Sequence, residues 1–86
     1  MREIKIGQVY QHFKGNCYVV LDVVNDCDNA PGEYSKKMVI YQALYGDHLK
    51  WARRLDEFMS EVDHVKYPNI TQKYRFEEIN LGEKSC

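Results

Sequence analysis

The run YVVLDVV, residues 18 to 24, constrains the fold of this chain more than any other segment. It is rich in valine, whose branched side chain loses less freedom on a pleated sheet than in a helix. The pair Gly15-Asn16 shortly before it is a two-residue turn signal, and YQHFK, residues 10 to 14, precedes that turn. The sequence therefore predicts a β-hairpin at the start of a mainly β fold.

Three further strands follow from composition and alternation. MVIYQALY, residues 38 to 45, is a strand that ends at Gly46-Asp47, and KWARRL, residues 50 to 55, is a shorter one. KYRFEEI, residues 73 to 79, alternates aromatic and charged positions in the manner of a half-buried strand. We therefore expect a small SH3-like barrel of about five antiparallel strands.

One short helix is predicted near residues 56 to 62. Apolar side chains recur there at helical spacing, at Leu55, Phe58, Met59 and Val62. Between the predicted strands at 18 to 24 and 38 to 45, residues 25 to 37 concentrate Asn, Asp, Pro and Gly, which are typical of turns. This segment is expected to be a long exposed loop.

Length and charge narrow the class of protein. A chain of 86 residues has room for one domain, residues 1 to 86, in which the polar end, 80 to 86, is expected to fray. The net charge of −1 removes the overall basic field of nonspecific nucleic-acid binders. No apolar stretch is long enough to span a bilayer, and no signal-peptide pattern is present, so no membrane association is expected.

The three cysteines, Cys17, Cys27 and Cys86, are odd in number and widely spaced. This pattern favours free thiols in a reducing compartment, and hence a cytoplasmic protein. No Cys or His pair has the spacing of a zinc site, so neither a metal nor another cofactor is expected.

The register of the first hairpin decides whether His12 is buried. If Gly15-Asn16 is a two-residue turn, His12 lies opposite Val19 on the apolar face. A three-residue loop from Lys14 to Asn16 would instead place it opposite Tyr18 and display it. We favour the first arrangement, in which His12 is neutral and hydrogen-bonded within the fold.

Three blocks of the sequence also resemble a known family. GQVYQHFKGNCYVVLDVV, MVIYQALYGD and WARRLDEF are similar, in order and spacing, to the conserved blocks of a small bacterial family catalogued as domain of unknown function 1653. The resemblance runs from Gly7 to Ile79. Arg54 and Glu57 depart from the family pattern, which has proline and methionine at those places, and the 25 to 37 loop is longer than usual. The resemblance implies an SH3-like barrel and brings no established activity.

The strongest concentration of candidate functional residues is LYGDHLKWARR and the strand before it. Aromatic and arginine side chains together provide stacking area and charged donors at interfaces. The candidate ligand-binding residues are Tyr41, Tyr45, Trp51 and Arg53, with the 25 to 37 loop beside them. In the structural alternative, Trp51 fills the core, the tyrosines pack the rim, and Arg53 reaches Asp22 or Asp47 or emerges at the barrel mouth.

We therefore expect a non-catalytic binding module for a peptide or protein partner. Single-stranded nucleic acid or a nucleotide is the alternative ligand, because such ligands also stack on aromatic rings. A small enzyme that uses His12 or His48, with Cys17 as nucleophile, is the second alternative. No motif surrounds that combination, so no catalytic residue is assigned.

Overall fold

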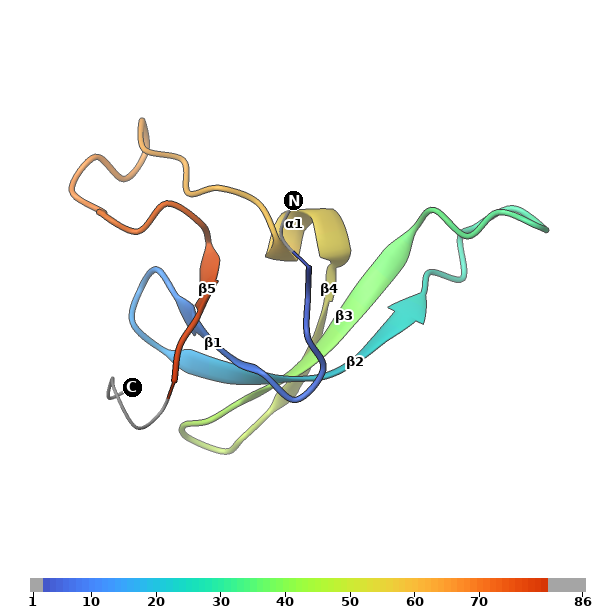
Figure 1. Cartoon of the computed structure of the whole chain (residues 1–86), viewed down its shortest axis with the longest axis horizontal. Coiled ribbons are helices and arrows are strands. Elements are labelled where there is room, and N and C mark those ends of the chain that lie inside the picture. The colour runs from blue at the N-terminus through green and yellow to red at the C-terminus, as the bar shows by residue number, and fades with distance from the viewer. Residues whose placement is uncertain (1–2, 81–86) are drawn as a thin grey trace.

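A computed structural model of the chain describes residues 3–80, and Figure 1 shows a single sheet with a short helix against it. The antiparallel strands run in the order β4-β3-β2-β1-β5. Their bounds are β1 Val9–His12, β2 Cys17–Asn25, β3 Lys37–Ala43, β4 Lys50–Arg54 and β5 Phe76–Glu78, and the helix is α1 Leu55–Phe58. The expectation of a mainly β fold with five antiparallel strands and one short helix is confirmed.

The expected closure into an SH3-like barrel is wrong, because β4 and β5 remain the two edges of the sheet. The segment that follows α1 in the chain instead contacts the residues just before β5. Glu61 and Tyr74 make an isolated antiparallel bridge, and the Arg75 N–H donates to the Ser60 carbonyl at 2.9 Å. These contacts join the segment after α1 to the residues just before β5, and β4 and β5 do not pair with each other.

The first hairpin differs from the predicted two-residue turn. Gln11 pairs with Cys17 and Tyr10 with Tyr18, so the loop is Phe13–Gly15. The Gly15 N–H donates to the His12 carbonyl, the His12 N–H donates to the Asn16 carbonyl, and Gly15 has a φ of 106°. This arrangement is a three-residue loop whose last position needs a positive φ, which glycine supplies without strain. Neither register considered from the sequence is formed.

The hairpin register and a β-bulge together determine the faces of β2. Because Tyr10 pairs with Tyr18, Val20 lies on the face of Tyr10 and is buried, whereas Leu21, which the predicted register places on the apolar face, is 37% exposed. Val20 pairs with Tyr41 and Asp22 with Ile40, so Leu21 is an extra residue without a partner in β3. The bulge shifts the alternation by one, which brings Val23 back to the core face opposite Val39.

The helix is shorter than predicted. α1 ends at Phe58, and Met59 is its C-terminal cap. Val62, the last residue of the predicted apolar stripe, is buried as expected but donates its N–H to the Lys73 carbonyl at 2.8 Å. Hydrogen bonding to the segment before β5 therefore replaces the last helical turn.

The core lies on one side of the sheet, under α1. Its buried members are Tyr10, Val20, Val39, Tyr41, Phe58 and Phe76. These side chains come from α1 and from every strand except β4. The core is thus filled by residues of the three central strands, edge strand β5 and the helix, and the other edge strand, β4, lies at its margin.

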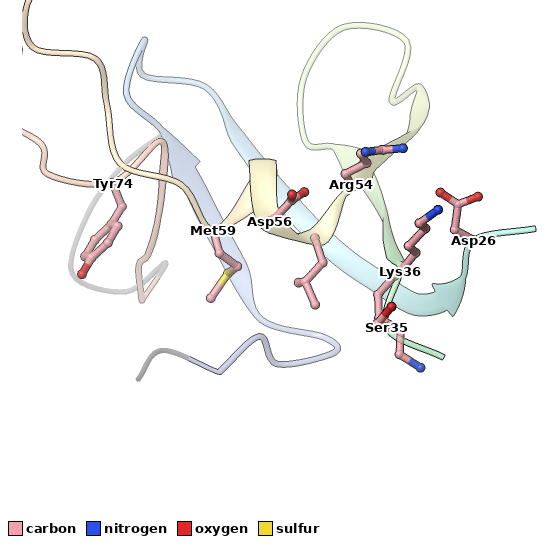
Figure 2. Close-up of a pocket in the computed structure, with 9 residues that line it drawn as sticks. Asp26, Ser35, Lys36, Arg54, Asp56, Met59 and Tyr74 are labelled. Atoms are coloured by element: carbon pink, nitrogen blue, oxygen red, sulfur yellow. The ribbon is translucent and has the colours of Figure 1, made fainter. Parts of the chain in front are cut away.

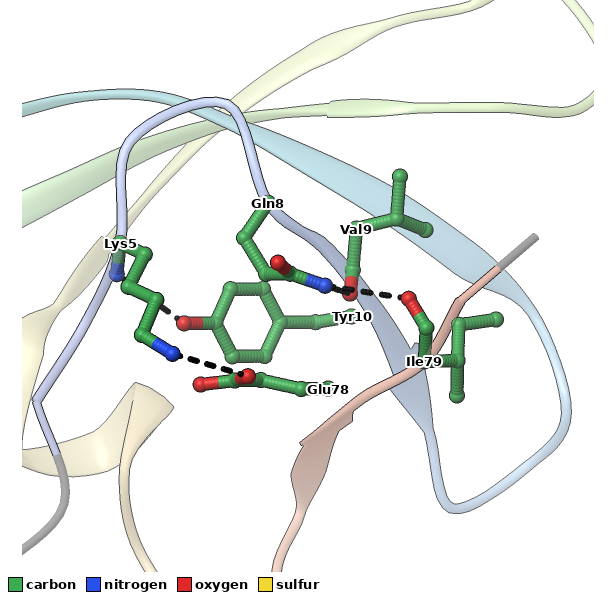
Figure 3. Close-up of polar contacts among 6 residues, drawn as sticks. All are labelled: Lys5, Gln8, Val9, Tyr10, Glu78 and Ile79. Atoms are coloured by element: carbon green, nitrogen blue, oxygen red, sulfur yellow. Dashed lines mark hydrogen bonds and ion pairs between the residues drawn. The ribbon is translucent and has the colours of Figure 1, made fainter. Parts of the chain in front are cut away.

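Figure 3 shows the polar contacts that attach the segment before β1 to the buried Tyr10 and to the neighbouring strands. The Lys5 N–H donates to the hydroxyl of Tyr10 at 3.1 Å, and Lys5 Nζ forms an ion pair with Glu78 at 3.4 Å. The amide of Gln8 donates to the carbonyls of Val9 and Ile79. These contacts attach the N-terminal segment to β1 and β5.

Among residues 3–80, no helix combines the length and the apolar character that a membrane-crossing helix requires. Residues 1–2 and 81–86 lie outside the described residues, including all but the first residue of the tail that was expected to fray.

Candidate functional site

The four residues predicted for ligand binding lie on one face of the sheet. Tyr41 on β3 is the cross-strand partner of Trp51 on β4, and Arg53 Nε donates to the Tyr41 hydroxyl at 3.3 Å. Tyr45 follows β3 and reaches the same face through Tyr18, whose ring packs edge-on against Tyr41 with centroids 5.3 Å apart. We call Tyr18, Tyr41, Tyr45, Trp51 and Arg53 the aromatic–arginine surface.

The members of this surface differ in exposure. Trp51 is 49% exposed and Tyr45 is 43% exposed, whereas Tyr41 is only 5% exposed. The interpretation of Trp51 as a core residue is therefore wrong. Phe58 and Phe76 fill the space under α1, and Trp51 stands on the edge strand beyond them. Trp51 and Tyr45 can contact a ligand, and Tyr41 supports them from below.

Arg53 does not pair with Asp22 or Asp47, the two partners expected from the sequence. Its guanidinium lies 4.0 Å from the carboxylate of Glu57, one helical turn away, and 5.9 Å from the ring centroid of Phe76. These contacts place the guanidinium between Glu57 and the buried ring of Phe76 while leaving it partly exposed. Its position provides a cation next to exposed aromatic rings.

A hydrogen bond between two tyrosines organises the far side of the surface. The hydroxyls of Tyr18 and Tyr45 lie 2.7 Å apart, and the rings meet edge-on at 5.6 Å. Burial of Tyr18, together with this hydrogen bond, raises the pKa of Tyr18 above its ordinary value. Tyr18 therefore remains a neutral donor or acceptor well above neutral pH.

His12 borders the surface and is half-buried. Its Nδ1 accepts the Lys14 N–H at 3.1 Å, and its ring packs edge-on against Phe76 with centroids 5.0 Å apart. Burial, together with the smaller effect of the positive charges of Arg75, Arg53 and Lys14, lowers the pKa of His12 to about 4. The predicted neutral, backbone-bonded histidine is thus present, although its partner across β1 and β5 is Phe76 and not Val19.

The residues of the enzyme alternative are not brought together as a nucleophile and a base. Cys17 is buried and disulfide-bonded, so the expectation of a free thiol is wrong at this position, and Cys27 is free. Cys86 lies outside the described residues. His48 lies in the β3–β4 turn with a φ of 53°, exposed to solvent. A disulfide-bonded sulfur provides no thiolate for attack.

The 25 to 37 loop does not adjoin the aromatic–arginine surface. It joins β2 to β3 at the end where Asn25 pairs with Lys37, whereas Tyr45 follows the opposite end of β3, near the Tyr18–Ala43 pair. Figure 1 shows this loop projecting away from the β3–β4 turn. Within it, Asp26, Cys27 and Asp28 place potential metal-ligand atoms within 4.8 Å of one another. All three are accessible to solvent, and the two carboxylates lie in a tight turn where Asp26 Oδ1 accepts the Asp28 N–H.

A pocket that the sequence did not predict lies between this loop and α1. It has a volume of about 640 Å³, and Figure 2 shows its lining residues. Its cationic lining residues are Lys36, Lys37 and Arg54. Its apolar lining residues are Leu55, Met59 and Tyr74. We call it the α1 pocket. These residues are distant in sequence and carry no common motif, so only their assembly in space reveals the pocket.

A family model for a protein of unknown function, DUF1653, matches residues 8–78, which is most of the chain. Neither the curated proteins nor the solved structures include a match to this sequence.

Proposed function

Because this chain belongs to DUF1653, a family of proteins of unknown function, we propose its role from its own surface: a non-catalytic module that binds an extended peptide segment of a partner protein along β4. The observation that carries this proposal is that β4 is an edge strand with an exposed tryptophan and several cations. An extended peptide can pair with such an edge and become a further strand.

The hydrogen-bonding pattern indicates which backbone groups are available. Ala43 N–H donates to the Leu49 carbonyl on the β4 side, and Leu44 N–H donates to the Cys17 carbonyl on the β2 side. In an antiparallel sheet this alternation continues along the pair. The N–H and C=O groups of Lys50 and Ala52 therefore face away from β3, where an added strand would meet them. Arg54 is the N-terminal cap of α1, so its carbonyl is used by the helix.

The side chains of β4 favour an acidic peptide with apolar residues. Lys50 and Arg53 provide positive charge, and Trp51 provides an exposed aromatic surface beside Tyr45. On an added strand, successive side chains alternate between the two faces of the sheet. Those on the inner face would contact Trp51 and Arg53, so the proposed ligand carries an apolar side chain and a carboxylate on that face.

Single-stranded nucleic acid or a nucleotide is the competing ligand, because bases could stack on Trp51 and Tyr45 next to Arg53. That mode would use the aromatic face without the backbone groups of β4. It would also lose affinity steeply with salt, in proportion to the number of phosphates contacted. These two differences separate the ligands experimentally.

The test is selection from a library of short extended peptides, followed by titration of the fluorescently labelled selected peptide, with its fluorescence anisotropy as the reporter. Because the label is on the peptide, the same reporter serves the parent and every variant, including those of Trp51, the only tryptophan in the chain. We expect the selected peptides to be acidic with interspersed apolar residues, and Trp51→Ala to weaken binding about tenfold or more. Tyr34→Ala, at an exposed aromatic in the 25 to 37 loop, is the control that should bind normally.

Ala52→Pro tests strand addition directly. Proline removes the outward N–H that the added strand needs, and an edge strand tolerates it where that N–H faces solvent. Ala52→Val retains the N–H and should bind the peptide as the parent does. If Ala52→Pro is folded and binds as tightly as the parent, strand addition is wrong. If the protein instead prefers single-stranded oligonucleotides, with an affinity that falls steeply with salt, the ligand is nucleic acid and the peptide proposal is wrong.

A cytoplasmic location also stays a prediction. It rested on free thiols, and Cys17 is disulfide-bonded while Cys27 is free. Counting accessible thiols in the protein isolated from its native source would test it.

A further inference from the structure

The α1 pocket brings positive charge and apolar surface to opposite ends of one cavity. Figure 2 shows Tyr74 and Met59 toward one end and Lys36, Arg54 and Asp26 toward the other. Its volume of about 640 Å³ lies in the range of pockets that enclose small ligands. A ligand that fills it would contact both kinds of lining at once.

The cations of this pocket lack carboxylate partners within the described part of the chain. The ion pairs there involve Lys5, Arg53 and Lys73. Lys37 Nζ donates instead to the side-chain carbonyl of Asn25 at 2.6 Å, which is a neutral acceptor. Three positive charges gathered at one site repel one another, and an anion between them relieves that repulsion.

The backbone that carries these lysines is fixed. The Lys36 N–H donates to the side chain of Asn29 at 3.0 Å, and the Lys36 carbonyl accepts both the Asn29 amide and the Asp26 N–H. The charged end of the pocket is therefore anchored at the base of the loop. A site whose backbone is already ordered loses less entropy when a ligand binds.

Two carboxylates also line the pocket, and none of the ion pairs in the described part of the chain joins either of them to a cation. Asp26 Oδ1 accepts the Asp28 N–H at 2.9 Å, and Asp56 Oδ1 accepts the Glu57 N–H at 2.8 Å. Both carboxylates are thus bonded to local backbone. Three cations against two carboxylates leave the lining with an excess of one positive charge.

We infer that the α1 pocket binds a small amphipathic carboxylate, with its apolar body against Leu55, Met59 and Tyr74 and its carboxylate between Lys36, Lys37 and Arg54. This site is distinct from the one proposed for the peptide, because its ligand contacts β4 only through the Arg54 side chain and needs neither the outward backbone groups of β4 nor Trp51. The excess positive charge of the lining calls for one negative group on the ligand. The apolar lining calls for an apolar body that is small enough for the cavity.

The test compares three probes of equal chain length: octanoate, the neutral octanamide and the cationic octylammonium. Binding is followed by two-dimensional amide NMR of the whole chain. We expect octanoate to produce saturable shifts at Lys36, Lys37, Leu55 and Met59, with an affinity about tenfold above that of octanamide. Octylammonium should bind more weakly than either. Equal or tighter binding of octylammonium would overturn the inference.

Variants locate the charge effect. Lys36→Ala combined with Lys37→Ala should reduce the affinity for octanoate to that for octanamide, because only the charged group of the probe is affected. Lys66→Ala, at an exposed lysine beside Tyr67, is the matched control and should bind as the parent does. Unchanged octanoate affinity in the double variant would contradict the site. Ala52→Pro should leave octanoate binding intact, so this inference can fail or succeed separately from the peptide proposal.

Discussion

Phe58 and Phe76 stack face to face, with ring centroids 4.1 Å apart and planes inclined by only 7°. This contact joins α1 to β5, which is otherwise only a three-residue edge strand. Both rings also meet Tyr41 edge-on, at 5.3 and 5.7 Å. The pair therefore holds the helix and the last strand on the same core and supports the underside of the aromatic–arginine surface.

We predict that Phe76→Ala destabilises the fold by about 3–5 kcal/mol, because it leaves a cavity beside Phe58. Phe76→Leu, which keeps most of the volume, should cost about 1–2 kcal/mol and serves if the alanine variant does not fold. Urea unfolding measures both. Val65→Ala, at a side chain 94% exposed, should change the free energy of unfolding by less than about 0.5 kcal/mol. Equal effects at Phe76 and Val65 would exclude the core described above.

The pKa of His12 predicts a loss of stability in mild acid. Its folded pKa of about 4 lies below the unfolded value of 6.5, so the unfolded chain binds more protons between these values. The contribution is fully present above pH 6.5 and declines as the pH falls toward 4. His12→Ala should reduce the decline measured between about pH 7.5 and about pH 5, while costing about 1–3 kcal/mol at the higher pH.

His48→Asn is the matched control for His12. His48 is exposed and has a positive φ, which asparagine tolerates. This variant should keep the acid dependence of the parent. An NMR titration of His12 that resembles that of a free imidazole would contradict the half-buried, neutral histidine.

The hairpin register predicts a specific sensitivity at Gly15. Gly15 has a φ of 106°, and nothing lies within 4 Å of the position that a Cβ would occupy. Gly15→Ala should therefore cost about 1–2 kcal/mol through backbone strain and not through a clash. Gly15→Asn should cost less, because asparagine visits positive φ more readily. Thermal unfolding distinguishes them, and equal stability of the glycine and alanine forms would favour a different turn.

The Tyr18–Tyr45 hydrogen bond predicts a change in alkaline titration. Because the pKa of Tyr18 is raised, its contribution to stability is present below the unfolded value of 10 and is lost as the pH rises above it. Tyr45→Phe removes the hydrogen bond and should lower the pKa of Tyr18 toward the ordinary value. Ultraviolet titration of the tyrosinates measures this shift. Tyr34→Phe, at an exposed tyrosine, should leave it unchanged.

Local sequence was sufficient for the existence of most elements. The valine-rich run forms β2, the Asn, Asp, Pro and Gly cluster forms the loop before β3, and the apolar stripe begins a helix at Leu55. Each of these signals acts through neighbours along the chain, by χ1 restriction, turn dihedrals or helical periodicity. The residues Tyr41, Tyr45, Trp51 and Arg53 could be selected as a group for the same reason, since strand alternation and composition placed them near one another.

Register, exposure and pocket were decided by tertiary contacts. The bulge at Leu21 and the loop at Gly15 set which face each side chain of the first hairpin occupies, and a shift of one residue reverses every face. Trp51 is exposed because Phe58 and Phe76, remote in sequence, already fill the core beside it. The α1 pocket arises where the loop, the β4–α1 junction and Tyr74 meet. The sequence by itself determined strands, loops and a mainly β class, because those depend on local dihedral preferences. The tertiary structure alone decided which side chains face solvent, because that depends on which distant residues compete for the same space.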